Sequence, residues 1–292
     1  MTRETRCPKD FADRLDRALP RLFAGLSRVQ ARKLISAGSV FIDGKRCRVS
    51  SRIGRAGARL LVADVAETRA AALRILFEDE DCIAVDKPAG MPSAPTRQAA
   101  AGTALELLRS ELQSRGVNAQ LWLVHRLDRD TSGVLLFART KSSARRLDAA
   151  FRNRDVEKEY LAWVSGVLDK DAGAIEKPIR LEGKRVRCDP SGYAAETHWS
   201  VAERAVDRTL VRLLPSTGRM HQLRVHLQSI GHPVLGDQLY GGSPAPRLML
   251  HAMRLRFPHP KREQSVEVVS SPTDLLRFPW TVGKLDDRRS HD

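Results

Sequence analysis

The sequence predicts an α+β protein with a small basic domain followed by a larger domain. From residue 73 onward, short apolar runs of strand length such as Leu121–Val124 and Val134–Ala138 alternate with amphipathic segments at helical spacing. Residues 1–60 contain 15 Lys and Arg against five Asp and Glu, a formal charge of +10, which leaves only +5 of the total +15 for the rest. We therefore expect two domains, residues 1–66 and 67–292, and expect the first to contact a polyanion such as RNA.

Composition argues against several other classes of protein. The four cysteines, Cys7, Cys47, Cys82 and Cys188, lie far apart without a CxxC pair, which predicts free thiols in a reducing compartment rather than a zinc site or a disulfide framework. No apolar run has the length of a membrane-spanning helix, and the first ten residues lack the apolar core of a signal peptide. We expect a cytoplasmic monomer that binds neither membrane nor metal.

The basic N-terminal segment has the pattern of two short helices and a hairpin. Phe11–Leu22 places its apolar residues on one helical face, and Ser27 with Gln30 forms a capping-box pattern at the start of a second helix. Asp43-Gly44 predicts a tight turn between two strands. Five side chains are candidate RNA contacts: Arg28, Arg32, Lys33, Lys45 and Arg46. A solvated charged face is the alternative interpretation, and the charge of +10 favours RNA binding.

The second domain opens with two predicted strands, Leu73–Phe77 and Cys82–Val85, on either side of an acidic turn. They lead into Lys87-Pro88-Ala89-Gly90, where proline and glycine predict a loop. Thr103 with Glu106 forms another capping box and predicts a helix that continues to about Ser114.

The central stretch reads LVHRLDRDTSGVLLFA, from Leu123 to Ala138. Its two apolar ends predict buried strands, so the polar centre becomes a loop that presents Arg126, Asp128 and Arg129 from a rigid sheet. Neighbouring positive charges keep a carboxylate ionised, which suits Asp128 to act as a nucleophile or an electrostatic partner. The alternative is a solvated turn with a surface ion pair, because most Arg/Asp clusters are of that kind.

Further elements follow in order along the chain. Ser142–Arg152 predicts a basic amphipathic helix, and the alternation around Tyr160 predicts a strand on which a tyrosine is ordinarily a core residue. Residues 167–195 are polar and carry no clear pattern. Thr197–Val201 and Arg208–Leu214 predict two more strands, and Arg219 lies at the turn from the second of them into a helix. His221 and His226 are five residues apart, which does not place both on one helix face as a metal site needs.

Four motifs together resemble the RluA-type pseudouridine synthases, enzymes that isomerise uridine in RNA. They are HRLDxxTSG around Asp128, KPxG at Lys87, KxYxAxVxG at Tyr160, and TGRxHQLRxH with GHPVLGDQLYG from Thr217 onward. The pattern SRVQARKLISAGSVFIDGK also resembles the alpha-L RNA-binding domain of ribosomal and tRNA-handling proteins. The resemblance covers nearly the whole chain and implies a mixed, largely antiparallel sheet with flanking helices. The family often has a histidine shortly after KPxG, and this chain has none there.

The resemblance also implies roles for residues. Asp128 would be the catalytic carboxylate, Tyr160 would stack on the flipped base and take part in proton transfer, and Arg219 would pair with Asp128. Arg126 would fill the gap left by the extruded nucleotide. The remaining substrate-binding candidates are Lys87, Thr131, Gly133 and Leu223. Because isomerisation leaves the composition unchanged, no cofactor or metal is required.

Several questions stay open on the sequence alone. We expect ribosomal RNA as the first candidate substrate and tRNA as the second, and the motifs do not say which uridine is modified. They also do not say whether Asp128 adds to the base or assists cleavage of the glycosidic bond. A non-catalytic RNA-binding or ribosome-assembly protein on the same scaffold is one alternative. The other is a nucleoside hydrolase that uses Asp128 and Asp130 as a carboxylate pair.

Overall fold

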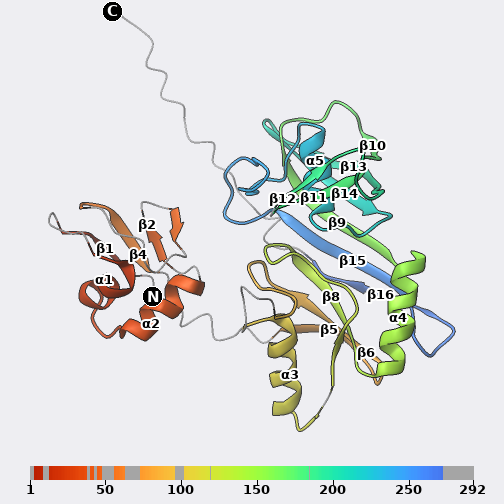
Figure 1. Ribbon diagram of the computed structural model, residues 1–292, viewed down its shortest axis with the longest axis horizontal. Coiled ribbons are helices and arrows are strands. Elements are labelled where there is room, and N and C mark those ends of the chain that lie inside the picture. Colours follow the sequence, from red (N-terminus) through yellow and green to blue (C-terminus); the bar gives the residue numbers. More distant parts are fainter. Residues whose placement is uncertain are drawn as a thin grey trace, which may run out of the picture. The chain divides into compact units, whose positions relative to one another are not determined.

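The structure is a computed structural model that describes residues 3–8, 13–37, 40–42, 45–47, 56–62, 73–95, 102–118, 120–183 and 185–271. The chain divides into two units, Met1–Ala72 and Leu73–Asp292 (Figure 1). The domain boundary that the sequence predicts at residue 66 lies outside the described residues. No helix in the described ranges is both long and apolar enough to cross a membrane.

The first unit packs two helices against a four-stranded antiparallel sheet of order β1-β4-β2-β3. Its elements are α1 (Leu15–Leu22), α2 (Arg28–Ala37), β1 (Arg3–Arg6), β2 (Val40–Ile42), β3 (Lys45–Cys47) and β4 (Arg59–Val62). The capping box that begins α2 is confirmed, because Gln30 N donates to Ser27 Oγ at 3.2 Å and Ser27 N donates to Gln30 Oε1 at 2.7 Å. Ile42 faces Lys45 across the expected hairpin, whose turn at residues 43–44 lies outside the described ranges.

The second unit is built on a ten-stranded sheet of order β10-β13-β14-β9-β15-β8-β6-β5, with β16 beside β15 and β7 beside β8. Its strands are β5 (Arg74–Glu78), β6 (Cys82–Lys87), β7 (Trp122–Leu123), β8 (Ser132–Ala138), β9 (Glu157–Ser165), β10 (Ala172–Ile175), β13 (Thr197–Arg204), β14 (Arg208–Pro215), β15 (Leu250–Pro258) and β16 (Ser265–Val269). All of these pairings are antiparallel except that of β15 with β8. The expected α+β class with a mixed, mostly antiparallel sheet is confirmed.

Helices cover both faces of the sheet at its centre. All seven residues of β8 are buried, and alternate side chains of a strand point to opposite faces. Leu136 packs with α4 (Lys141–Asn153), whereas Leu135 and Phe137 pack with α3 (Ala104–Ser114). The apolar run after the central motif is therefore continuous because both of its faces lie in a core.

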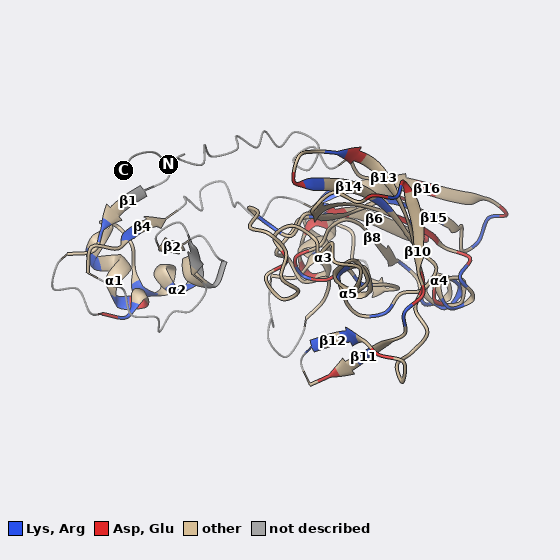
Figure 2. Cartoon of the chain, turned by 90° about the horizontal axis from the view of Figure 1, so that it is seen from above, with Lys and Arg blue, Asp and Glu red and all other residues tan. Residues whose placement is uncertain are grey.

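The polar stretch 167–195, which the sequence left unassigned, contains β10 and a separate hairpin. The hairpin joins β11 (Ile179–Glu182) to β12 (Arg185–Cys188) as a two-stranded sheet of its own. Figure 2 shows it projecting from the main sheet near α5 (Gln222–Ser229). It packs there through a small core that includes Val186 of β12 and Val225 of α5.

Candidate active site

Asp128 lies in the loop between β7 and β8, and the backbone on each side of it is anchored. Ser93 Oγ donates to Leu127 O at 2.8 Å and accepts from Leu127 N at 3.1 Å. On the other side, Arg129 O accepts from Gly90 N at 2.8 Å and from Lys87 Nζ at 3.1 Å. The KPxG motif and Ser93 just after it therefore hold the Asp128 loop in place from both sides.

Lys87 is central to these anchoring contacts. Its side chain is fully buried, and Nζ donates to the carbonyl oxygens of Pro88, Met91 and Arg129 at 3.1, 2.8 and 3.1 Å. Burial lowers the pKa of Lys87 to about 7, against the opposing charges of Asp130 and Asp128. The expectation that Lys87 contacts substrate directly is wrong in this structure, because all three donors of an ammonium group are already used on the protein's own backbone.

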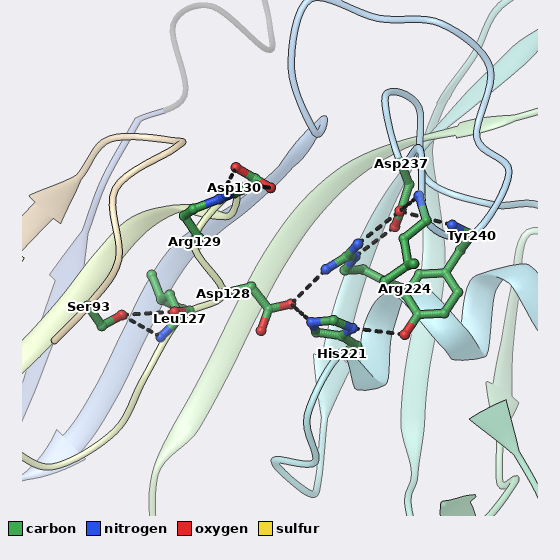
Figure 3. A network of polar contacts seen from close by, with 10 residues as sticks. Ser93, Leu127, Asp128, Arg129, Asp130, His221, Arg224, Asp237 and Tyr240 are labelled. Atoms are coloured by element: carbon green, nitrogen blue, oxygen red, sulfur yellow. Dashed lines mark hydrogen bonds and ion pairs between the residues drawn. The ribbon is translucent and has the colours of Figure 1, made fainter. Parts of the chain in front are cut away.

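The arginine that faces Asp128 is Arg224, not Arg219. Arg224 Nη1 lies 3.3 Å from Asp128 Oδ2 (Figure 3). Arg219 instead donates through Nε to Ala194 O at 3.2 Å and lies over the ring of Tyr193. The expected pairing of Arg219 with Asp128 is therefore wrong. The turn at His221, with φ 54°, separates Arg219 from the helix α5 that carries Arg224.

Asp237 fixes the orientation of Arg224. The carboxylate accepts from Nε at 2.7 Å and from Nη2 at 2.9 Å, which leaves Nη1 directed at Asp128. Burial would lower the pKa of Arg224, but the hydrogen bonds and charge of Asp237, together with Asp128, raise it above its ordinary value. The guanidinium is thus a permanent, bidentately held cation beside the candidate catalytic group.

His221 is a second neighbour of the same carboxylate. Its Nε2 lies 3.8 Å from Asp128 Oδ2, and its Nδ1 lies 2.8 Å from the Tyr240 hydroxyl (Figure 3). Burial lowers the pKa of His221, with Asp128 acting in the opposite direction. Non-glycine residues with positive φ are uncommon and are found at sites where the surrounding contacts enforce them. Here Tyr240 supplies such a contact.

Tyr160 lies in β9, and its side chain packs against two separate apolar cores of the second unit. Its side chain is partly buried. Burial and the negative charge of Asp128 raise the pKa of Tyr160, so the phenol stays protonated at neutral pH. The predicted roles of Tyr160 in base stacking and proton transfer remain predictions.

Four further residues were predicted to contact substrate, and their surroundings differ. Arg126 is exposed beside Asp128, and Leu223 is buried in the core at the start of α5. Thr131 is buried, and its Oγ1 lacks a partner among the described residues. Gly133 has φ +113°, and a Cβ there would lie 2.1 Å from Ala252 O, so its backbone position has a structural reason. The proposed substrate contacts of these residues remain predictions.

In the first unit, two of the predicted RNA contacts are engaged within the protein. Arg28 and Arg32 both bind Asp16 Oδ2, at 3.1 and 2.9 Å, while Arg14 binds Oδ1 at 3.1 Å. Asp16 is fully buried; burial would raise its pKa, but the three arginines hold it well below its usual range. The arginine side chains stay about half exposed, at 47% and 54% for Arg28 and Arg32. Lys33 lies in α2, and Lys45 and Arg46 lie in β3.

One group of potential metal ligands escaped the sequence analysis: Asp79, Cys82 and His259. His259 Nε2 lies 2.7 Å from Asp79 Oδ2, and its Nδ1 accepts from the backbone of residues 261 and 262. Asp79 Oδ1 accepts from two backbone N–H groups, and burial raises the pKa of the Cys82 thiol to about 12. These contacts make the group a hydrogen-bonded link between the β5–β6 turn and the end of β15.

Sequence reasoning also missed Ser93, His221, Arg224, Asp237 and Tyr240 as parts of the site. Four of them lie within the two motifs from Thr217 onward, so the motifs marked the right segments but not the right side chains. The resulting constellation is a carboxylate at the tip of an anchored loop, an arginine and a histidine opposite it, and a protonated tyrosine nearby. Such a site can stabilise charge beside a bound base without a second carboxylate.

Comparisons with known proteins agree with this geometry. Residues 81–229 match the model of the RNA pseudouridylate synthase family, and residues 13–60 match the S4 domain. A ribosomal large subunit pseudouridine synthase D from Nitrosomonas europaea is 34% identical over 90% of this chain and 82% of that protein. The dual-specificity RNA pseudouridine synthase RluA of Salmonella typhi is 41% identical over 64% of this chain and 88% of that protein.

A solved structure is similar as well. The human RNA pseudouridylate synthase domain containing 1 superposes with a TM-score of 0.59 at 29% identity, over 69% of this chain and 84% of that chain. The motifs, the fold and the arrangement around Asp128 lead to one conclusion: the chain belongs to the RluA family of RNA pseudouridine synthases, which are isomerases, and carries an N-terminal S4 RNA-binding domain.

Proposed function

We propose that this enzyme isomerises a uridine of large-subunit ribosomal RNA, with Asp128 as the catalytic carboxylate. One observation carries the assignment of Asp128: it is the carboxylate that a doubly anchored loop presents to a buried arginine held in place by Asp237. A negative group whose position is fixed before substrate binds is suited to stabilise positive charge that develops on ribose as the glycosidic bond weakens.

The isomerisation rearranges bonds within the uridine and leaves its composition unchanged. The bond between N1 of uracil and C1′ of ribose breaks, and a bond between C5 and C1′ forms. The proton on C5 leaves, and N1 gains one. Asp128 acts at C1′ or on the base, Arg224 binds its carboxylate with His221 close by, and the protonated phenol of Tyr160 borders the pocket in which the detached base turns.

Access to the uridine requires that it leave the RNA stack. The exposed side chain of Arg126 lies on the same loop as Asp128 and occupies the space that the uridine vacates. Filling that space offsets part of the unstacking free energy, which is on the order of a few kcal/mol. Lys87 does not contact the substrate. It is a positioning residue, because it fixes the loop that carries both Arg126 and Asp128.

We choose ribosomal RNA because of how much of this chain each relative matches. The Nitrosomonas europaea relative, whose name specifies the large ribosomal subunit, matches over 90% of this chain, so the match must extend into the S4 domain. The Salmonella typhi relative, whose name specifies dual specificity, matches over only 64%. Transfer RNA is accordingly the second candidate substrate.

A nucleoside hydrolase using two carboxylates is less well supported. Asp130 is held by Arg129, with Nε to Oδ1 at 3.0 Å and Nη2 to Oδ2 at 2.9 Å, apart from the Asp128 contacts (Figure 3). Both carboxylate oxygens thus face a cation, whereas a general acid in a hydrolase must carry a proton.

The test incubates purified protein with transcribed large-subunit ribosomal RNA, and separately with pooled tRNA, and maps pseudouridine in each. We expect modification of the ribosomal RNA, none with the Asp128→Asn variant, and no free uracil. Modification of tRNA alone would refute the substrate assignment. Release of uracil, or full activity of Asp128→Asn, would refute the proposed chemistry or the assigned carboxylate.

A further inference from the structure

Tyr193 presents an aromatic ring to solvent close to the start of helix α5. Its side chain is 73% exposed, and it is the only aromatic among the exposed large apolar side chains of the described residues. Aromatic side chains ordinarily bury most of their surface. An open ring in a basic, RNA-binding protein is therefore available to another planar group.

The backbone that carries this ring is fixed. Tyr193 N donates to Ile179 O, and Ile179 N donates to Tyr193 O, both at 2.9 Å, which ties the residue to β11. Gly192 lies against the same strand so closely that a Cβ would come within 2.4 Å of Ile179 C. The ring is exposed without being on a loose loop, so little backbone freedom is lost when a ligand stacks on it.

Arg219 supports the ring. Its Cζ lies 5.4 Å from the centroid of the Tyr193 ring, within the range of a cation–π contact. The arginine is itself held, because Nε donates to Ala194 O at 3.2 Å and its backbone N donates to Gln222 Oε1 at 2.9 Å. The side chain that the motif suggested as a partner of Asp128 is thus committed to the segment that presents Tyr193.

This arrangement is continuous with the active site. Arg219 precedes His221 by two residues, and His221 Nε2 lies 3.8 Å from Asp128 Oδ2. The neighbouring hairpin, residues 179–188, has four cationic residues against one Glu, and it packs on α5. Cations that attract the phosphate backbone and a rigid aromatic ring are the two components of surfaces that bind single-stranded nucleic acid.

We propose that Tyr193, backed by Arg219, is a stacking platform for an unpaired nucleobase that flanks the target uridine. The proposal rests on the proposed function of the same site. Stacking tolerates any base, because every base has a π-face, and so the platform fixes where the neighbouring nucleotide lies rather than its identity. Ordering that nucleotide helps keep the target uridine out of the helix and over Asp128.

The test measures equilibrium binding of an RNA hairpin that contains the mapped uridine, with Asp128→Asn as a background that prevents turnover. Tyr193→Ala should weaken binding by about 5- to 150-fold, the range of one base–aromatic stack. Tyr193→Phe and Tyr193→Trp should bind as the background protein does, whereas Tyr193→Leu should resemble Tyr193→Ala. Val206→Ser, at a 93% exposed position between β13 and β14, is the matched surface control and should change nothing.

A set of hairpins with an abasic site at each flanking nucleotide identifies the stacked base. The effect of Tyr193→Ala should vanish on one abasic RNA and persist on the others, since two changes that remove the same contact are not additive. The proposal is overturned if Tyr193→Leu binds normally, if Tyr193→Ala binds normally, or if its effect is equal on every abasic RNA.

Turnover by the otherwise unaltered protein tests the proposed function separately. If that protein modifies its RNA and Tyr193→Ala binds normally, the platform alone is refuted. If no RNA is modified, binding of fluorescein-labelled single-stranded oligouridylate decides the platform. Tyr193→Ala must weaken that binding, and equal binding overturns the proposal.

Discussion

Asp128 Oδ2 has two different nitrogen neighbours, Arg224 Nη1 at 3.3 Å and His221 Nε2 at 3.8 Å, and their difference in charge defines what each can do. Arg224 is a permanent cation held by Asp237, whereas His221 is a partly buried imidazole whose pKa is lowered by burial. The arginine therefore supplies fixed charge, and the histidine supplies a dipole that Tyr240 orients. Arg224 thus fixes the position of the carboxylate, and His221 adds a neutral polar neighbour.

The corrected pairing predicts different consequences for the two arginines. Arg224→Lys keeps a positive charge but cannot bind Asp237 with two groups and still reach Asp128, so we expect the single-turnover rate at saturating RNA to fall by about 10²-fold. Arg219→Gln should instead raise the RNA concentration needed for half saturation and leave the saturated rate within about threefold.

Single-turnover kinetics over a range of enzyme concentrations measure both quantities. Thermal unfolding of each variant is the control for global damage, because loss of one partner from a buried ion pair is destabilising. If Arg219→Gln lowers the saturated rate as much as Arg224→Lys does, the assignment of Arg224 as the partner of Asp128 is incorrect.

The lowered pKa of Lys87 predicts that the free energy of unfolding depends on pH. Its ordinary pKa of 10.5 is lowered to about 7 by burial. Below pH 7 the folded and the unfolded chains both carry the proton; between about pH 7 and 10.5 the unfolded chain binds more protons than the folded one. The contribution of Lys87 to the free energy of unfolding therefore rises with pH across this window.

The measurement compares the protein with Lys87→Met in urea at pH 6.5, 8 and 9. The difference in unfolding free energy, original minus variant, should increase with pH, and taking the difference cancels the titration of Lys158, whose pKa is also lowered, to about 8. No tryptophan precedes residue 73, and Trp122, Trp163 and Trp199 lie within strands of the unit that contains Lys87, so tryptophan fluorescence follows that unit. A difference that stays constant with pH would contradict the lowered pKa.

At the scale of elements, β8 and β15 approach each other closely where they pair in parallel. Gly133 pairs with Ala252 there and with Lys87 on the other side. Gly133→Ala would combine a positive φ with a Cβ 2.1 Å from Ala252 O, so we expect a loss of about 2–4 kcal/mol in unfolding free energy.

Gly116→Ala is the matched control. Gly116 also has positive φ, at +77°, but nothing lies within 4 Å of a Cβ built there, so only the backbone term of about 1–2 kcal/mol applies. Urea unfolding of both variants, followed by tryptophan fluorescence, gives the comparison. Equal losses would mean that the sheet relaxes around residue 133.

The elements were largely predictable from sequence because local patterns determine them. The strand from Val134 to Ala138, the helix after Ser142 and the capping box of Thr103 with Glu106 are all confirmed. The hairpin of β11 and β12 was not predicted, because its exposed strands lack an apolar alternation and part of its core is supplied by distant residues such as Val225. Local patterns carry no information about such contacts.

The site was predictable as a set of segments but not as a set of contacts. Two arginines five residues apart share one motif, and the backbone turn at His221 decides which of them faces Asp128. Lys87 belongs to a motif with a loop-forming sequence, yet its role follows from burial, which depends on the whole fold. Motif reading therefore located the segments of the candidate site, and the three-dimensional packing shows which of their side chains contact one another.

At the scale of the whole molecule, charge divides the chain into a strongly basic first part and a weakly basic remainder. Residues 1–60 carry +10 and the remainder +5. Within the first unit, Arg14, Arg28 and Arg32 share the charge of Asp16, so this group contributes less positive charge than its arginines suggest. The first part nevertheless carries most of the net positive charge of the chain. Removal of residues 1–66 should for that reason weaken RNA binding and flatten its dependence on salt.

Each lost phosphate contact reduces the slope of log K against log salt by about 0.7–0.9, so a reduction of two or more is expected. The residues of the candidate active site, among them Lys87, Asp128, Tyr160 and Arg224, all belong to the unit that begins at Leu73. At low salt and saturating RNA, the truncated enzyme should thus approach the single-turnover rate of the full chain, with circular dichroism as the control for folding. An unchanged salt slope would show that the S4 domain makes few phosphate contacts. A folded but inactive truncation would show that the first unit helps to form the site.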